Sequence, residues 1–109
     1  MNTTATGSIA ASGVKAATAV MRNRAHNTAN LTTPGFQPGR TSLIEDAPGV
    51  RAETQWGAQD PDQGPEAASS VDLAHETVQG IAARALYTAN LAVIRSEDER
   101  LGTLLDTKA

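Results

Sequence analysis

The stretch "NTANLTTPGF", residues 27–36, ends a long helix-forming run and decides how the chain is organised. Pro34 fixes its own φ and disfavours helical geometry in the residue before it, and Gly35 admits backbone angles closed to other residues. The asparagines and threonines ahead of them favour helix ends, because their side chains hydrogen-bond nearby backbone groups. The sequence therefore predicts a helix that stops near residue 30 and a sharp turn after it.

The alanine-rich run before this turn predicts a helix over about Thr6–Asn30, because its apolar residues recur close to the 3.6-residue helical period. The predicted apolar face consists mostly of small residues: Ile9, Gly13, Ala16, Ala17, Val20 and Met21. Alanine favours helix but buries little surface, so this helix is expected to be marginal on its own.

The middle segment, residues 37–68, holds four prolines and four glycines and predicts a short β-hairpin. "TSLI" (41–44) and "VRAETQW" (50–56) flank "EDAPG", which suits a turn containing Pro-Gly. One face of the second strand is expected to carry Val50, Ala52, Thr54 and Trp56. The following residues, 57–70, have the composition of a linker.

The third segment, residues 69–109, predicts the longest helix, over about Ser70–Thr107. Ser69, Ser70 or Asp72 suits its N-cap, and Asp72 and Glu76 suit the positive end of the helix dipole. At ~1.5 Å per residue this helix spans about 55 Å.

Apolar residues at alternating steps of three and four predict a packing seam on this helix, as in a coiled coil. The regular part of the predicted seam is Val71, Ala74, Val78, Ile81 and Ala85. Its less regular continuation is Leu86, Val93, Ile94, Leu101, Leu104 and Leu105. An amphipathic helix packed on any apolar partner remains the alternative.

The predicted fold is mainly α. Its long N- and C-terminal helices form an antiparallel helical hairpin or coiled coil around a short irregular or β-hairpin middle segment. The segments are 1–36, 37–68 and 69–109, in at most one small domain of 109 residues. Aromatic residues make up only 3% of the chain, so the core is expected to be thin and the helices to need partners.

The charge of the chain is unevenly distributed. The formal net charge is -3. Residues 1–36 carry three bases and no acid (+3), residues 37–68 two bases and six acids (-4), and residues 69–109 four bases and six acids (-2). Such a balance gives no case for nucleic acid. A basic first helix and an acidic last segment can attract each other, within one chain or between chains.

No catalytic or metal-binding constellation stands out, and we expect no enzyme, cofactor or small-molecule ligand. The chain has no cysteine, which excludes a disulfide framework and Cys-based sites. His26 and His75 lie far apart on polar helical patterns and are expected at the surface or at helix caps. The acids at 97–99 are expected on an exposed helix face.

Two aspartates in the middle segment suggest a calcium loop but do not fit one. Asp60 and Asp62 precede Gly64, yet the glycine stands one position early and the bidentate Glu is missing. The chain also shows no cleavable signal peptide and no membrane-spanning stretch.

Two motifs at opposite ends together resemble the bacterial flagellar basal-body rod and hook family. The N-terminal matches to its "NIANxxTPG(F/Y)" pattern are Asn27, Ala29, Asn30, Thr33, Pro34, Gly35 and Phe36. The C-terminal matches are Ser69, Val71, Asp72, Leu73, Glu76, Val78, Ile81, Ala83, Tyr87, Ala89, Asn90, Val93, Ile94, Asp98, Glu99, Leu101, Gly102, Thr103, Leu104 and Leu105. With their helices, the motifs cover about two-thirds of the chain.

The resemblance implies a structural axial subunit that contributes to flagellum-dependent motility. In this family the terminal helices pack as a coiled coil in the inner core of a tubular filament, and the middle segment faces outward. The implied partners are further copies, other rod or hook subunits, and the flagellar type III export apparatus. The implied location is the periplasm-spanning rod, reached without a cleaved signal peptide.

Departures from the family pattern keep an alternative open. Thr28 stands where the family usually has Ile or Leu, and the middle segment is short, so a proximal-rod-like member or a paralogue is the nearest type. The alternative is a non-polymerising adaptor or regulator that binds one rod or hook subunit. Asn27 and Asn30 are expected to hydrogen-bond the helix-end backbone or the returning helix. Phe36 is expected to anchor the exit against that helix or a neighbouring subunit.

Overall fold

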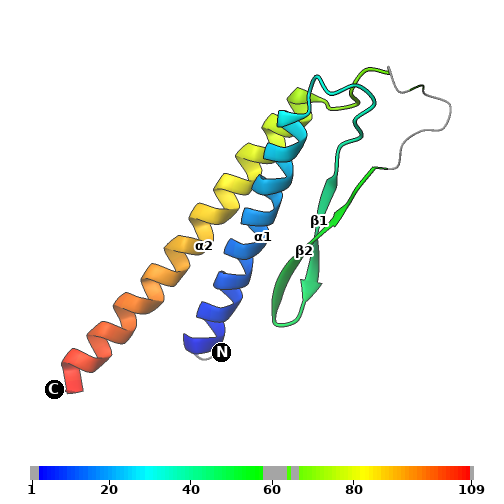
Figure 1. Cartoon of the computed structure of the whole chain (residues 1–109). Coiled ribbons are helices and arrows are strands. Elements are labelled where there is room, and N and C mark those ends of the chain that lie inside the picture. The colour runs from blue at the N-terminus through cyan, green and yellow to red at the C-terminus, as the bar shows by residue number, and fades with distance from the viewer. Residues whose placement is uncertain (1–2, 58–63, 65–66, 109) are drawn as a thin grey trace.

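The computed structural model describes residues 3–57, 64 and 67–108 and shows an elongated, mainly helical molecule. Its elements follow the order α1 (Thr3–Ala29), β1 (Arg40–Asp46), β2 (Gly49–Gln55) and α2 (Leu73–Lys108). Figure 1 shows α1 lying between α2 on one side and the β-hairpin on the other. The molecule measures 69 × 22 × 15 Å. Neither described helix combines the length and apolar character needed to cross a membrane.

The predicted helical hairpin is present, with ends shifted by a few residues. The helices run antiparallel, because the end of α1 contacts the beginning of α2. Of the three predicted caps, Asp72 is the one used: its Oδ1 accepts the backbone N–H groups of Ala74 at 3.0 Å and His75 at 3.2 Å. Asp72 therefore satisfies two amide groups that an uncapped helix leaves open.

The predicted β-hairpin is also present. Its antiparallel register runs from Arg40 opposite Gln55 to Asp46 opposite Gly49, which leaves a two-residue loop. The predicted inner positions of β2 up to residue 54 are half-buried, and β2 rather than β1 packs against α1. Asp60 and Asp62, which were expected to be solvated linker acids, and most of the linker lie outside the described residues.

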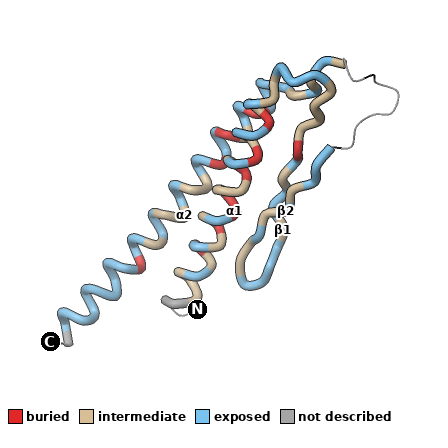
Figure 2. Tube along the Cα trace, in the orientation of Figure 1, coloured by how far each residue is buried: buried red, intermediate tan, exposed pale blue. Residues whose placement is uncertain are grey.

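The two helices meet along a seam of buried and half-buried positions on their facing sides (Figure 2), and most of the residues there are small or polar. On α2, seven buried or half-buried positions follow alternating steps of four and three: Glu76, Gly80, Ala83, Tyr87, Asn90, Ile94 and Glu97. Gln79, Leu86 and Leu91, next to this line, are also half-buried. On α1, the buried positions are Ala10, Gly13, Ala16, Ala17, Val20, Asn23 and Asn27. Gly80 allows this close approach, because a Cβ there would overlap the Arg24 side chain.

The seam predicted from apolar spacing on α2 is therefore wrong. Ala74 and Ala85 are exposed, and Val78 and Ile81 are 62% and 65% exposed. Small residues bring the two backbones close, and the inner face of α2 is the one that carries the buried polar contacts of Glu76. Val78 and Ile81 consequently lie on the side of α2 that faces away from α1. Of the predicted continuation, only Leu86 and Ile94 are half-buried.

Glu97 corrects a second expectation. It occupies the last seam position and is 9% exposed, although the run 97–99 was expected to be solvated. Its Oε1 accepts from Arg100 at 3.3 Å, and its Oε2 is buried with no hydrogen-bond partner. Asp98 and Glu99 are exposed, as expected. Glu97 is buried because it lies three residues after Ile94, on the same side of α2; the acidic residues next to it in the sequence lie on other sides of the helix.

We expect the isolated chain to be weakly stable. The buried apolar residues of the described part are Ala10, Ala16, Ala17, Val20 and Ala83. Four of the five are alanines, each of which removes little apolar area from water, so ordering of the backbone is poorly offset. Circular dichroism of dilute protein should show partial helicity that rises with protein concentration. A sharp cooperative melt well above room temperature, independent of concentration, would contradict this prediction.

Candidate functional site

A group of buried polar side chains joins three segments where α1 ends. Asn27, only 1% exposed, donates from Nδ2 to Gly39 O and to Glu76 Oε1, both at 2.9 Å. Its Oδ1 accepts from Gly39 N at 3.0 Å. The amide of Asn27 thus pairs with both backbone groups of Gly39, as a peptide group in a sheet would, while also holding α2. We call Asn27, Gly39 and Glu76 the Asn27 clasp.

Two further α1 side chains reinforce the clasp. Asn23 lies one turn before Asn27 on the same helix face, and its Nδ2 donates to Gly39 O at 2.8 Å. Arg24 Nε donates to Glu76 O at 2.7 Å. The exit segment and the start of α2 are therefore held to α1 by hydrogen bonds that are mostly sheltered from water, where leaving a group unpaired is costly.

The TPGF turn follows directly and has its own hydrogen bonds. Asn30 Nδ2 donates to His26 O at 2.9 Å, and Thr33 Oγ1 donates to Asn30 Oδ1 at 3.0 Å. Gly35 has φ of 72°, in the left-handed region that side chains with a Cβ rarely adopt. The expectation that Asn27 and Asn30 hydrogen-bond the helix end or the returning helix is confirmed by these contacts.

The turn also receives the returning chain. Gly35 N donates to Ala67 O at 2.5 Å, and Ser70 N donates to Phe36 O at 2.9 Å. These backbone bonds place the segment before α2 beside the turn, two residues before the Asp72 cap. Together with the clasp they fix the register of α2 against α1.

An aromatic cluster covers the outer side of this junction. The His26 ring lies 5.6 Å from the Phe36 ring and 5.1 Å from the Trp56 ring, measured between centroids. The Phe36 ring therefore packs on a residue of α1, and its backbone C=O accepts from Ser70 N just before the returning helix. The expected contact with a neighbouring subunit stays a prediction. His26 and His75 are both exposed, as predicted.

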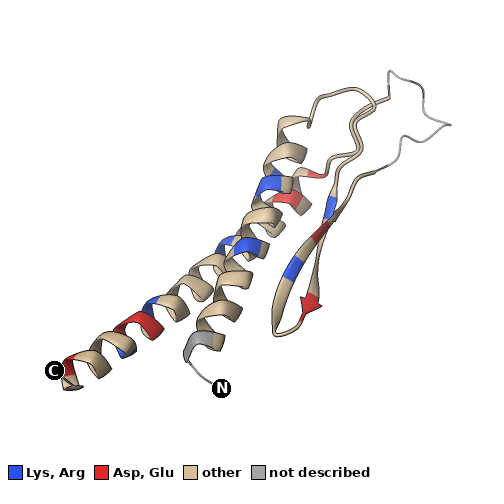
Figure 3. Ribbon diagram, turned by 60° about the horizontal axis from the view of Figure 1, so that its bottom comes forward, with Lys and Arg blue, Asp and Glu red and all other residues tan. Residues whose placement is uncertain are grey.

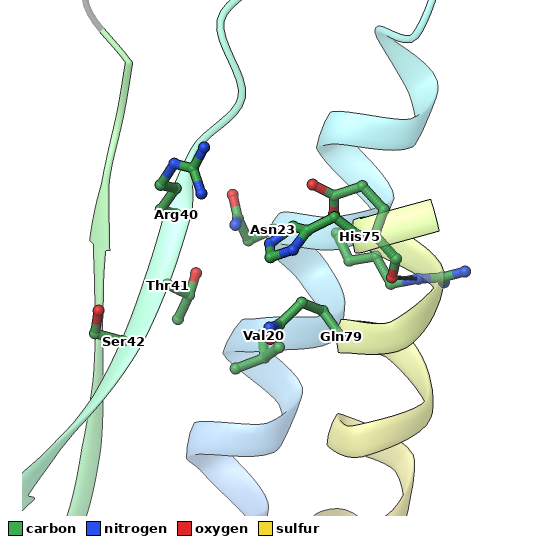
Figure 4. A pocket seen from close by; sticks show the side chains of 9 residues that line it. Val20, Asn23, Arg40, Thr41, Ser42, His75 and Gln79 are labelled. Atoms are coloured by element: carbon green, nitrogen blue, oxygen red, sulfur yellow. Dashed lines mark hydrogen bonds between the residues drawn. The ribbon is translucent and has the colours of Figure 1, made fainter. Parts of the chain in front are cut away.

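A polar pocket of about 220 Å³ opens beside the clasp, between α1, β1 and α2. Figure 4 shows Asn23 directed into it between Arg40 and His75. Asn23 Oδ1 is buried without a hydrogen-bond partner. Within the described part of the chain, no three His, Asp or Glu side chains are grouped to hold a metal ion. The hydrogen bonds made by the pocket-lining residues Asn23 and Arg24 join α1 to Gly39 and to α2.

A second feature is the apolar surface of α2 that α1 does not cover. We call Ala74, Val78, Ile81 and Ala85 the outer α2 face; all four are exposed. Beyond the part of α2 that α1 covers, Leu101, Leu104 and Leu105 are also exposed; we call them the C-terminal leucines. Apolar side chains gathered on one side of a helix mark an interaction surface more often than isolated ones do.

The predicted site residues divide into three groups. Those brought together at the junction are Asn27, Asn30, Thr33, Pro34, Gly35, Phe36, Val71, Asp72 and Glu76. Those half-buried on α2 toward α1 are Tyr87, Asn90 and Ile94. Those left exposed are Ala29, Leu73, Val78, Ile81, Ala89, Val93, Leu101, Leu104 and Leu105.

Sequence reasoning missed three residues of the junction. Asn23 and Arg24 had one detectable signal, since they continue the helical spacing of Val20 toward Asn27 and so belong to the packed face. Gly39 had none, because its role is to offer a backbone N–H and C=O to a side chain twelve residues away.

No protein-family model matches the chain, and a search of curated protein sequences finds no relative. The resemblance to the rod and hook family therefore stays a prediction carried by the motif residues. Any functional conclusion rests on those residues and on the geometry of the junction and of α2.

Thr28 stands where the rod and hook family usually has Ile or Leu, and the effect of this difference on stability can be tested. Its Oγ1 is buried and has no hydrogen-bond partner. Replacing Thr28 with valine keeps the shape and removes this polar group, so the free energy of unfolding should rise by about 1 kcal/mol. Thr18→Val is the matched control, because Thr18 Oγ1 donates to Val14 O at 2.8 Å. Urea titrations that show equal effects at the two positions would contradict the prediction.

Proposed function

We propose that this chain is a structural axial subunit of the bacterial flagellar rod that self-assembles through its terminal helices. The two motifs that resemble the rod and hook family support this proposal together. Asn27 of the first motif donates to Glu76 of the second at 2.9 Å, so the motifs form one structural unit. The same unit holds Gly39, at the start of the middle segment, against α1.

The observation that carries the proposal is the exposure of apolar motif positions on α2. Val78 and Ile81 are well exposed, although both match the family pattern. Exposure of two β-branched residues one turn apart costs free energy in a monomer. Burial of the same residues against another subunit would recover that free energy. The fold of the single chain leaves these two side chains exposed, which supports a role in contacts between chains.

We further infer that the terminal helices pack as a coiled coil in the assembled rod. The alternating steps of four and three along the inner side of α2 match the spacing of coiled-coil seams. The β-hairpin covers the opposite side of α1, and this position suits a segment that faces outward in a tube. The thin core suits a chain that unfolds for export and gains stability on assembly.

The decisive experiment is the purification of basal bodies from the bacterium that encodes this chain. We expect an epitope-tagged chain to remain in the rod after hook and filament are removed, in several copies per basal body, as measured by quantitative mass spectrometry. The adaptor alternative predicts a soluble complex with one rod or hook subunit and no chain in the rod. That second outcome would overturn the proposal.

A further inference from the structure

The packed side of α2 continues past the part covered by α1. The seam positions step from Glu97 to Leu101 and then to Leu104, again by four and three residues. Both positions are leucines, and they are 46% and 56% exposed. Figure 1 shows this end of α2 extending beyond the first described turn of α1. The leucines thus present a packing surface that the chain itself leaves uncovered.

A groove toward the opposite end of the molecule offers a matching surface. It has a volume of about 370 Å³ and is lined by Ala19, Arg22, Asn23, His26, Thr54 and Trp56. Trp56 is 60% exposed, and its ring meets His26 edge-on. We call this the α1–Trp56 groove. It combines an exposed aromatic wall with a cationic rim, both of which are common at protein interfaces.

We propose that the C-terminal leucines of one copy bind in the α1–Trp56 groove of a second copy, so that copies join head to tail. This inference rests on the proposed self-assembly and names one of its contacts. The two surfaces differ and lie toward opposite ends of the molecule. A contact of this heterologous kind leaves a free surface at each end and builds an open filament when the rotation does not close.

The dimensions of the two surfaces agree. The groove follows α1 from Ala19 to His26, which is two helical turns. Leu101 to Leu105 span about one helical turn of α2, so the leucines fit within the length of the groove, and their spacings of three and four residues place them on one face of the helix.

The charges of the two surfaces also agree. Residues 97–109 carry four acids and two bases, a net charge of -2, whereas the groove lining holds Arg22 and no acid, on a helix that carries three bases and no acid. Figure 3 shows the acids toward the end of α2 and the basic residues along α1. Within the described part of the chain, the ion pairs join Arg51 to Glu53 and Arg100 to Glu97, so none joins an α1 base to an α2 acid. The attraction between these charges is therefore available for a second copy.

The groove of the same chain is out of reach. The antiparallel packing places Asn90 against Gly13 and Glu76 against Asn27, so Leu104 lies beyond Thr3 along the axis. Ala19 is sixteen residues further along α1, about 24 Å at ~1.5 Å per residue. A contact between Leu104 and Ala19 therefore requires two chains.

Cysteine cross-linking tests this contact cleanly, because the natural chain has no cysteine. Full-length Leu104→Cys protein is mixed with full-length Ala19→Cys protein and oxidised, at a concentration and osmolyte content where circular dichroism shows both folded. We expect the mixed disulfide at least about tenfold above that of a matched pair, Leu104→Cys with Ser8→Cys. Ser8 is exposed on α1, whereas Ala19 is half-buried, and Ser8 lies eleven residues before Ala19, outside the groove. Equal yields in the two pairs would overturn the inference.

Trp56→Ala in the Ala19→Cys protein supplies an independent readout. Removing the aromatic wall should lower the yield of the mixed disulfide severalfold, and an unchanged yield would contradict the groove as the binding surface. Basal-body purification separates the two proposals. A selective cross-link in a chain that is absent from the rod overturns only the flagellar function. A chain present in the rod without the selective cross-link overturns only this contact.

Discussion

Replacing Asn27 with alanine is expected to lower the free energy of unfolding by about 3–5 kcal/mol, because the substitution leaves buried polar groups unpaired. Gly39 N and Glu76 Oε1 each lose the Asn27 amide as a partner, and Gly39 O retains only Asn23. Native domains have only about 5–15 kcal/mol of stability, and this chain has a thin core. The substitution should therefore separate the returning helix from α1.

Asn30→Ala is the matched control for this experiment. Asn30 is the same residue type, less than one turn further on, but its hydrogen bonds to His26 O and Thr33 Oγ1 are exposed to water. Its replacement should cost about 1 kcal/mol or less. Urea titrations followed by circular dichroism, in a fixed concentration of trimethylamine N-oxide to strengthen folding, measure both variants. Equal losses would show that the Asn27 clasp does not hold the junction.

The gross fold was predictable because local backbone preferences specify it. Pro34 and Gly35 stop α1 within the chain, and Asp72 caps α2, through effects that act over a few residues. The β-hairpin followed from the alternation around Val50 and Ala52 and from the Pro-Gly turn. Each of these signals depends on a few neighbouring residues, so it can be recognised in a single sequence without knowledge of the packing.

The packing of α2 was not predictable from its apolar pattern. That pattern identifies the most hydrophobic side of the helix, and it was assumed that this side packs within the chain. Here the inner side is chosen by close approach at Gly80 and Ala83 and by the buried contacts of Glu76. A small residue reveals nothing about its partner until the partner helix is placed, and the outer apolar side of α2 stays exposed in the single chain.

Replacing both Val78 and Ile81 with aspartate is expected to abolish assembly while leaving the fold of the single chain largely intact. Both side chains point away from α1, so neither contributes to the packing of the helical hairpin. In a contact between subunits, each contributes about 1.5–3 kcal/mol of apolar burial, and each aspartate adds the cost of an unpaired buried charge. We therefore expect the critical concentration for assembly to rise by at least about a hundredfold. Sedimentation of full-length protein over a concentration series measures it.

The single substitution Thr77→Asp separates loss of apolar contact from added charge. Thr77 is exposed on the same stretch of α2 but lies outside the outer α2 face. Its replacement adds one negative charge without removing apolar surface from that face, so the critical concentration should change less than about tenfold. If the double variant assembles as readily as Thr77→Asp, the outer α2 face is not a contact between subunits. If both variants lose helicity at concentrations below those needed for assembly, the substituted residues are required for α2 to fold. Their exposure in the single chain would then not indicate a surface free for another subunit.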